Sequence, residues 1–237
     1  MPIVDGAGVP LAYEEAGAGP TVLLVHGIGA GRLRWGAALA GAARVVAYDR
    51  RGYGDSGAPD PYSRTTVSEQ AEDAAALLAA LDAAPAVACG VDLGALVVLD
   101  LLLRHPGSVR AAVLVDAPAF PLVAEATAAL AAEREALETA LREDGPQAAM
   151  AGWAALRGIP EPAAGVPPQV FFADYGAQAT LALSRRELRG IAAPVAVLDG
   201  PAAPAHVRAA GDALAALLAG ARRGGTEDPA AAVRALL

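Results

Sequence analysis

A candidate catalytic carboxylate stands at the centre of the segment Gly90–Gly94, where Asp92 lies between two glycines. An apolar run precedes this segment and a predicted helix follows it. This is the setting of a nucleophile elbow, a tight turn that exposes its central side chain. A carboxylate there could attack a carbon atom or act as an acid or base. The alternative is that Asp92 only caps the helix that follows it.

Backbone N–H groups could stabilise negative charge beside Asp92. The N–H of Leu93, directly after the elbow residue, would point at a bound molecule. The loop His26–Gly29 follows another apolar run and would supply a second N–H, from Ile28. Two such donors form an oxyanion hole, which stabilises the charged oxygen of a transition state. We therefore predict an oxyanion hole made by Ile28 and Leu93.

The elements that must position these groups are indicated by apolar runs of strand length that alternate with helical patterns. Residues 1–15 predict an antiparallel hairpin, and Ser68 is the expected N-cap of the first long helix. Strands that alternate with helices predict a mainly parallel sheet with helices on both faces, and a site at the carboxyl ends of the strands. The expected parallel strands are residues 21–25, 44–48, 85–89, 111–115 and 194–198, and the expected helices are residues 67–82, 94–104, 205–219 and a last one beginning at Asp228-Pro229.

Three motifs in this order, each at a strand end, resemble those of the α/β-hydrolase superfamily over nearly the whole chain. The third motif is the segment Tyr48–Gly57, after the second parallel strand. The resemblance implies an α/β-hydrolase fold, with a core of residues 1–118 and 191–237 and a helical cap of residues 119–190. Members with aspartate at the elbow resemble epoxide hydrolases and haloalkane dehalogenases, whose carboxylate attacks carbon. The family also has an acid after a later strand and a histidine near the C-terminus.

The sequence departs from this family at both the acid and the histidine. Alanine fills the acid position after the strand that ends at Leu198, so Asp116, after the strand that ends at Val115, is the better substitute. Asp116 could instead be a turn-forming residue. The stretch Ala221–Pro229 keeps a Glu-Asp-Pro pattern but has no histidine. Because an ester intermediate needs a histidine-activated water, ordinary ester hydrolysis is not our first interpretation.

Further residues could surround a pocket at these strand ends. Of the three histidines, His26 is expected to be structural and His105 to end a helix far from the pocket. His206 begins a helix and could face the pocket or the surface. Aromatic side chains of the cap could form the roof of the pocket or simply pack on the core. The predicted pocket residues are His26, Gly27, Gly29, Trp153, Phe171, Phe172, Tyr175 and His206.

Composition narrows the classes of partner. The chain has 237 residues, 55% of them hydrophobic, and a formal net charge of −8 without a basic stripe, which argues against nucleic acid or anionic membranes as partners. No apolar run is long enough to span a bilayer, and no metal-ligand spacing occurs, so we expect no metal and no cofactor. A single cysteine, Cys89, and a start without a signal-peptide pattern favour the cytoplasm. The expected ligand is a small molecule or a peptide.

Three functions fit these residues. The main hypothesis is a non-hydrolytic enzyme, an epimerase, isomerase or cyclase of a small apolar, peptide or polyketide metabolite, with Asp92 and Asp116 as its catalytic carboxylates. The chain lacks a complete catalytic triad, and in this it is similar to α/β-hydrolase-fold proteins of natural-product pathways, such as the bottromycin-type peptide epimerases. One alternative is an epoxide, lactone or ester hydrolase with His206 or the substrate as base. The other is a non-catalytic ligand-binding protein.

The last strand of the sheet is expected to be missing or to be a stub. No apolar run of strand length occurs between residues 220 and 228. The strand at residues 194–198 would then be an exposed edge of the sheet. Because an unpaired edge invites another chain, a homodimer across it would be favoured.

Overall fold

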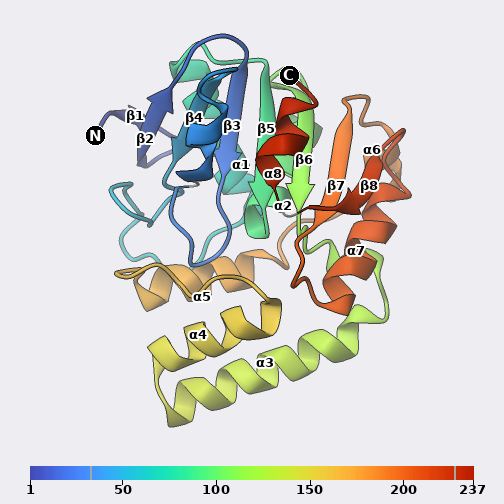
Figure 1. The fold of residues 1–237 in the computed structure, drawn as a ribbon. Coiled ribbons are helices and arrows are strands. Elements are labelled where there is room, and N and C mark those ends of the chain that lie inside the picture. Colours follow the sequence, from blue (N-terminus) through green and yellow to red (C-terminus); the bar gives the residue numbers. More distant parts are fainter. Residues whose placement is uncertain (33, 227) are drawn as a thin grey trace.

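The computed structural model describes residues 1–32, 34–226 and 228–237. Its centre is an eight-stranded sheet in the order β1-β2-β4-β3-β5-β6-β7-β8 (Figure 1). β2 pairs antiparallel with β1 and β4, and the other neighbours pair parallel, so the predicted hairpin and mainly parallel sheet are confirmed. The strands are β1 (Ile3–Asp5), β2 (Pro10–Ala16), β3 (Thr21–Val25), β4 (Arg44–Tyr48), β5 (Ala86–Val91), β6 (Val109–Val115), β7 (Val195–Asp199) and β8 (Arg222–Gly225).

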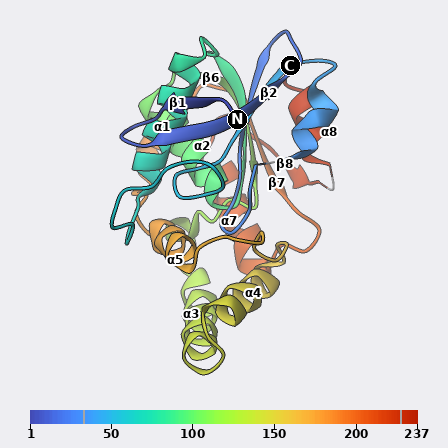
Figure 2. The same ribbon diagram turned by 90° about the vertical axis from the view of Figure 1, so that its left-hand side faces the viewer.

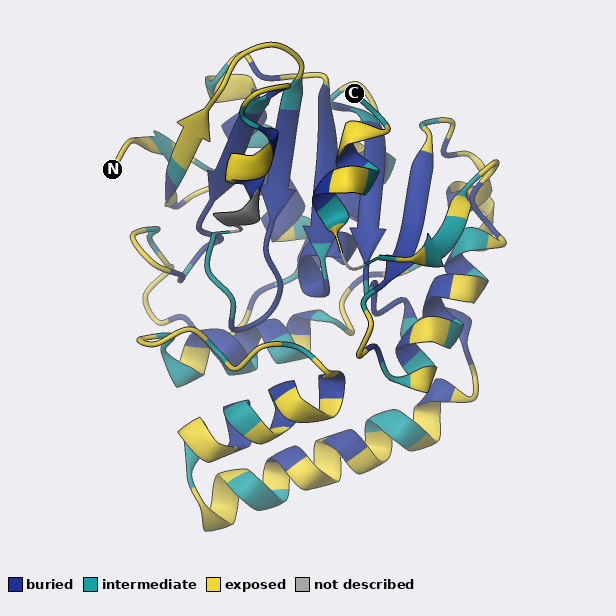
Figure 3. Cartoon of the chain, in the orientation of Figure 1, coloured by how far each residue is buried: buried dark blue, intermediate teal, exposed yellow. Residues whose placement is uncertain are grey.

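Helices cover both faces of the sheet. α1 (Val67–Ala80), α2 (Leu93–Arg104) and α7 (Ala205–Ala215) pack on one face, and the 3-10 helix η1 (Arg34–Leu39) and α8 (Pro229–Arg234) on the other. Figure 2 shows α1 and α2 on the opposite side of the sheet from α8. The central strands are buried on both faces (Figure 3), which explains their continuous apolar sequences. Every helix in the described ranges is too short or too polar to cross a bilayer.

The segment between β6 and β7 lies over the carboxyl ends of the strands, where the cap was expected (Figure 1). Its longest helix, α3, packs against α4, and the N-terminal end of this segment packs on α7. We call residues 119–190 the cap segment. Its helices are η2 (Phe120–Leu122), α3 (Ala126–Glu143), α4 (Pro146–Arg157), α5 (Pro168–Ala177) and α6 (Arg185–Arg189).

The N-cap of α1 is Thr66, so the prediction of Ser68 is wrong. The Thr66 hydroxyl accepts a hydrogen bond from the N–H of Glu69 (3.1 Å), and the Glu69 carboxylate accepts one from the N–H of Thr66 (2.8 Å). This reciprocal pair satisfies two N–H groups that the first turn leaves free, whereas a cap at Ser68 would satisfy only one.

The final strand is present, so the prediction that it is missing or a stub is corrected. All four residues of β8 pair with β7, from Ala196↔Arg222 to Asp199↔Gly225. The strand is short and lacks apolar residues; Arg223 instead holds it through Asp199 (2.5 Å) and Asp212 (2.8 Å). Because β8 covers the edge of β7, that edge is not free to pair with a second chain, and the expected homodimer across it loses its basis.

Candidate functional site

The turn between β5 and α2 is a strained elbow with Asp92 at its apex. Asp92 has φ 51° and ψ −122°, a conformation that a residue with a side chain adopts only where the surrounding structure enforces it. The flanking glycines make the turn fit. A Cβ on Gly90 would lie 2.2 Å from the carbonyl oxygen of Gly94, and a Cβ on Gly94 would lie 2.3 Å from that of Val25. The Asp92 side chain makes no capping hydrogen bond, contrary to the helix-cap alternative.

The Asp92 carboxylate is buried, and each of its oxygens has a partner. The N–H of Ile28 donates to Oδ2 (3.1 Å), and the guanidinium of Arg157 donates to Oδ1 through Nη2 (3.1 Å). The structure therefore brings the predicted oxyanion donor Ile28 to Asp92 itself. Leu93 is the first residue of α2, directly after the elbow. One carboxylate oxygen is thus fixed by the core, and the other faces the cap segment.

Sequence reasoning missed Arg157, which ends α4 and has a side chain only 2% exposed. Its Nη1 also donates to Glu133 Oε1 (3.3 Å), and the indole N–H of Trp153 donates to the same oxygen (2.7 Å). The guanidinium lies over the rings of Phe120 (4.9 Å) and Trp153 (5.2 Å). A planar cation with donors on two sides can bridge two carboxylates and stack on aromatic rings at once, which lysine cannot do.

Asp92, Arg157 and Glu133 form what we call the carboxylate–guanidinium cluster. Two carboxylates share one cation, so the formal charge of the cluster is −1. The sequence contains a signal that could have identified Glu133. It lies at helical spacing between Leu130 and Leu137, on the inward side of α3, which is an unusual place for a charge. Arg157 had none, because a cation in the last turn of a helix is ordinary.

A cavity of about 570 Å³ reaches this cluster from the cap segment. Glu133 and Gln178 are in its wall, and both contact Arg157, the Gln178 amide oxygen at 3.4 Å. Arg157 therefore stands between the cavity and Asp92. The lining is mainly apolar and consists of Phe120, Pro121, Thr127, Leu130, Ala131, Glu133, Arg134, Tyr175, Gly176, Gln178 and Ala179.

Asp116 lies near the elbow but is engaged by the backbone. It follows β6 with φ 51°, and its Oδ1 accepts a hydrogen bond from the N–H of Gly200 (2.8 Å). Burial raises the pKa of its carboxyl, the Gly200 N–H opposes that shift, and the charges of Asp199 and Asp92 add to it. Asp116 thus serves at least as a turn residue that joins the ends of β6 and β7.

His206 and His105 lie in different surroundings. Nε2 of His206 is 3.5 Å from Glu133 Oε2, too distant for a good hydrogen bond, and its ring packs on Phe120 with centroids 5.4 Å apart. Burial and the charge of Arg157 lower the pKa of His206 against the opposing effect of Glu133, so its imidazole is neutral at pH 7. His105 follows the end of α2 and contacts Glu72 (3.1 Å), away from the cluster, as predicted.

Three aromatic side chains of the cap segment pack against one another, and a fourth lines the cavity. Trp153 and Phe171 are fully buried and meet edge to face, with centroids 5.2 Å apart, and Phe172 continues the stack. Tyr175 alone of the four is part of the cavity wall. The structure thus supports core packing for three of these side chains and a lining position for Tyr175.

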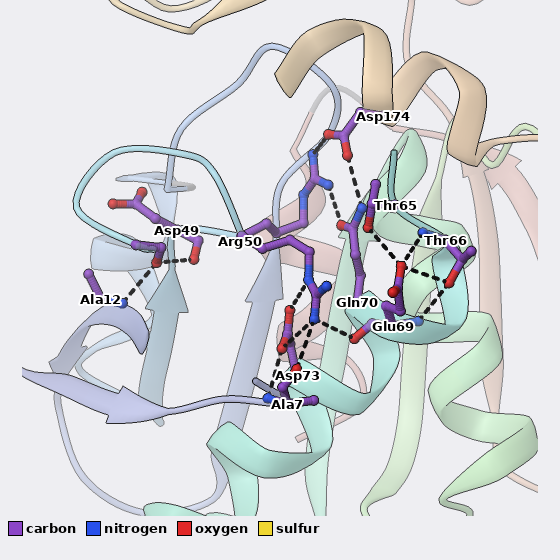
Figure 4. A network of polar contacts seen from close by, with 12 residues as sticks. Ala7, Ala12, Asp49, Arg50, Thr65, Thr66, Glu69, Gln70, Asp73 and Asp174 are labelled. Carbon is purple, nitrogen blue, oxygen red and sulfur yellow. Dashed lines mark hydrogen bonds and ion pairs between the residues drawn. The ribbon is translucent and has the colours of Figure 1, made fainter. Parts of the chain in front are cut away.

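A second buried polar network ties the oxyanion loop to the cap segment, and Figure 4 shows the part of it that joins Arg50 and Gln70 to Asp174. Arg50 donates to the carbonyl oxygen of Gly27 (2.9 Å) and to Asp174 of α5 (2.6 Å). The hydroxyl of Tyr53 donates to Asp174 (2.7 Å) and accepts from the N–H of Gly29 (3.1 Å). Burial by itself lowers the pKa of Arg50, but the Asp174 charge overrides it and the pKa is raised. These bonds hold the peptide groups on both sides of Ile28.

His26 belongs to this network. Its Nε2 accepts from the N–H of Arg50 (3.0 Å), so the ring proton lies on Nδ1, which donates to the carbonyl oxygen of Gly27 (2.9 Å). Burial and the charge of Arg50 lower its pKa well below the usual value. A neutral ring with both nitrogens engaged has the geometry expected of a structural residue.

Gly27 leaves room for the elbow, which leads to a testable expectation. A Cβ on Gly27 would lie 2.9 Å from Cβ of Asp92, closer than such atoms approach. Gly27→Ala should therefore displace Asp92 and cost about 1–3 kcal/mol of unfolding free energy, measurable by denaturant titration. The matched control is Gly152→Ala in α4, where nothing lies near the added methyl and stability should hold or rise. Equal stability in both variants would contradict this packing argument.

A mainly parallel sheet, a carboxylate on a strained elbow and an oxyanion loop beside it are features of one superfamily. A sequence profile of the alpha/beta hydrolase fold family matches residues 20–159, and the chain belongs to that family. An α/β hydrolase from Sphaerobacter thermophilus has a similar structure, with a TM-score of 0.72 and 25% identity over 96% of this chain and 93% of that chain.

Curated relatives match only in part. Epoxide hydrolase A of Mycobacterium tuberculosis is 37% identical over 125 residues, which are 50% of this chain and 39% of that protein. Bifunctional epoxide hydrolase 2 of Sus scrofa is 36% identical over 118 residues, which are 48% of this chain and 21% of that protein. The chain therefore spans well under half the length of these two relatives.

Proposed function

We propose that this chain hydrolyses small neutral molecules with an electrophilic carbon (an epoxide, a lactone or an ester) and that Asp92 is the carboxylate on which the reaction depends. The observation that carries the proposal is that the two oxygens of Asp92 have different partners, one from the core and one from the cap segment. Oδ2 is fixed by the N–H of Ile28, and Oδ1 faces the cap segment. Oδ1 pairs with a side chain of the cap segment and not with the backbone, so it becomes available for chemistry when the Arg157 guanidinium moves aside.

Two further observations support a hydrolase. The partial relatives named above are epoxide hydrolases. The mainly apolar cavity beside the cluster suits a neutral substrate. An anionic substrate is disfavoured, because the cluster already has a formal charge of −1 and its only cation is shared by two carboxylates.

Asp92→Asn tests this proposal. The substitution nearly preserves shape and removes the charge, so turnover of styrene oxide or p-nitrophenyl butyrate should fall at least about a hundredfold. The fold should tolerate the change, because Arg157 keeps Glu133 as its partner. Thermal unfolding of the same samples checks this. Asp212→Asn, an exposed acidic residue on α7, is the control and should keep full activity. Full activity in Asp92→Asn would contradict the proposal.

A non-hydrolytic reaction remains the second candidate, and one contact favours it. Arg157 occupies the cap side of Asp92 Oδ1, the direction from which a carbon atom would have to approach for direct attack. A carboxylate in that position can still take up a proton, as an epimerase or isomerase requires. Deuterium uptake from heavy water into an unhydrolysed ligand, lost in Asp92→Asn, would identify this activity.

A further inference from the structure

The wall of the cavity contains a buried carboxylate, that of Glu133, whose side chain is 5% exposed. Its Oε1 accepts hydrogen bonds from the indole N–H of Trp153 (2.7 Å) and from Arg157 (3.3 Å). No residue of the described ranges donates a hydrogen bond to Oε2. A buried carboxylate oxygen is stable only where a donor reaches it, from the protein, from water or from a ligand. Oε2 of Glu133 is therefore the atom at which this cavity can hold a polar group.

His206 does not satisfy this oxygen. Its Nε2 lies 3.5 Å from Oε2 of Glu133, and this nitrogen is enclosed without a hydrogen-bond partner in the described part of the chain. Burial and the charge of Arg157 lower the pKa of His206, so the ring is neutral at pH 7. The imidazole thus supplies Glu133 with neither a good hydrogen bond nor a positive charge.

The charges around Oε2 favour a cation. Asp92 and Glu133 share the single guanidinium of Arg157, which leaves the cluster with a formal charge of −1. The wall has one further charged side chain, Arg134, which is 69% exposed and pairs with Glu138 (2.7 Å), so water and this carboxylate screen it. Opposite charges attract more strongly where water is excluded. One positive charge beside Oε2 would make the cluster neutral.

The rest of the wall is suited to an apolar body. Phe120, Leu130 and Tyr175 contribute large side chains to it. The amide of Gln178 is already engaged, because its oxygen accepts from Arg157 (3.4 Å) and its nitrogen donates to the carbonyl oxygen of Tyr175 (3.2 Å). Recognition of a polar group therefore depends on Glu133, while burial of apolar surface binds the remainder of the ligand.

We propose that this cavity binds small amines, in which a primary ammonium group on an apolar aromatic body donates a charge-assisted hydrogen bond to Oε2 of Glu133. The ring of the ligand packs against Phe120 and Tyr175. Asp92 is not in the wall and takes no part, so this binding site goes beyond the proposed function and does not depend on it. A neutral substrate would use the same apolar walls, so an amine would compete with it.

Three probes of similar shape test the charge preference by isothermal titration calorimetry at pH 7. They are 3-phenylpropylamine, which is a cation, 4-phenyl-2-butanone, which is a neutral acceptor, and 3-phenylpropanoate, which is an anion. The amine should bind at least about tenfold more tightly than the ketone, and the anion should bind most weakly. Equal affinity for amine and ketone, or no binding of the amine, would overturn the proposal.

Glu133→Gln should reverse the preference. Trp153 and Arg157 keep an oxygen at the position of Oε1, so the amide nitrogen takes the place of Oε2 and presents N–H groups to the cavity. The amine should then bind about tenfold or more weakly, and the ketone at least as tightly as before. Glu135→Gln removes an exposed charge from the same helix and should change neither affinity. Equal losses of amine binding in both variants would overturn the assignment to Glu133.

Ala131→Phe tests the location without altering the cluster. Ala131 is exposed on α3 and is in the wall of the cavity, so the added ring should fill the space and weaken amine binding about tenfold or more. Ala132→Phe, exposed at the next position and outside this wall, is the control and should keep full affinity. Unchanged amine binding in Ala131→Phe would overturn the cavity site. Because these measurements need no turnover, a chain that binds the amine but hydrolyses none of the test compounds would contradict the proposed function alone.

Discussion

Arg157→Met should reduce the free energy of unfolding by about 3–5 kcal/mol at pH 7, a drop of roughly 10 °C in melting temperature for a chain of this length. Methionine fills similar space but has no charge, so the variant leaves the carboxylates of Asp92 and Glu133 buried without a cation between them. Two like charges in a site shielded from water repel strongly. Chemical denaturation followed by circular dichroism measures the loss.

The pH dependence identifies the cause of that loss. In the Arg157→Met variant, protonation of either carboxylate relieves the repulsion, so the folded state binds more protons than the unfolded chain near neutrality. The deficit relative to wild type should therefore shrink as the pH falls from about 7 to about 5. Adding Asp92→Asn should also recover stability, because only one carboxylate then remains. If the loss of unfolding free energy is the same at every pH and is not reduced by Asp92→Asn, its cause is lost packing against Phe120 and Trp153.

A surface ion pair provides the comparison for Arg157. Arg134 on α3 contacts Glu138 (2.7 Å), and both side chains are largely exposed. Exposed pairs contribute little because water and salt screen them. Arg134→Met should therefore leave the unfolding curve almost unchanged at every pH tested. A comparable loss there would show that the burial of the cluster is not what makes Arg157 important.

Asp174→Asn should have a similarly large effect, about 3–5 kcal/mol, at the second buried network. The Asp174 side chain is 0% exposed and accepts from Arg50 (2.6 Å), Tyr53 (2.7 Å) and Gln70 (2.9 Å). Asparagine nearly keeps the shape but removes the charge and replaces one acceptor oxygen with a donor. The guanidinium of Arg50 then remains buried without an anion.

This variant should also loosen the oxyanion loop. Arg50 and Tyr53 hold Gly27 and Gly29, so a shift in either side chain loosens the segment that presents the N–H of Ile28. Hydrogen exchange at the Ile28 amide should therefore become faster, beyond the change expected from global destabilisation. If exchange at the Ile28 amide increases only as much as the loss of global stability predicts, the cap segment does not position the loop.

Asp73→Asn is the matched control for Asp174→Asn. Asp73 is also buried and pairs with an arginine, Arg51 (2.7 Å), but its other contact is the N–H of Ala7 rather than the oxyanion loop (Figure 4). The two variants should lose comparable stability. Only Asp174→Asn should change exchange at Ile28, since only that carboxylate joins the cap segment to the loop.

The sequence by itself determined the sheet and the elbow, because both are encoded by neighbouring residues. A strand buried on both faces needs a continuous apolar run, such as Thr21–Val25, and the structure places β3 on those residues. The elbow needs glycine where a Cβ would collide with backbone, and Gly90 and Gly94 meet that need within five residues. Local sterics and burial leave signals that can be read without knowing the fold.

The last strand has no such local signal in the sequence. Residues Arg222–Gly225 have no apolar pattern, yet they pair with β7 because Arg223 contacts Asp199 and Asp212 while the backbone completes the ladder. An edge strand has one exposed side, so pairing with its neighbour can hold it without apolar side chains.

The composition of the candidate site was decided by the tertiary structure alone. Arg157 is 65 residues from Asp92 and 24 from Glu133, and in the last turn of α4 it reads as an ordinary surface residue. Asp174 is 124 residues from Arg50. Opposite charges attract at any sequence separation, and which of them meet depends on how the cap helices pack over the strand ends. That packing turned the isolated carboxylate visible in the sequence into a buried cluster of two carboxylates and one guanidinium.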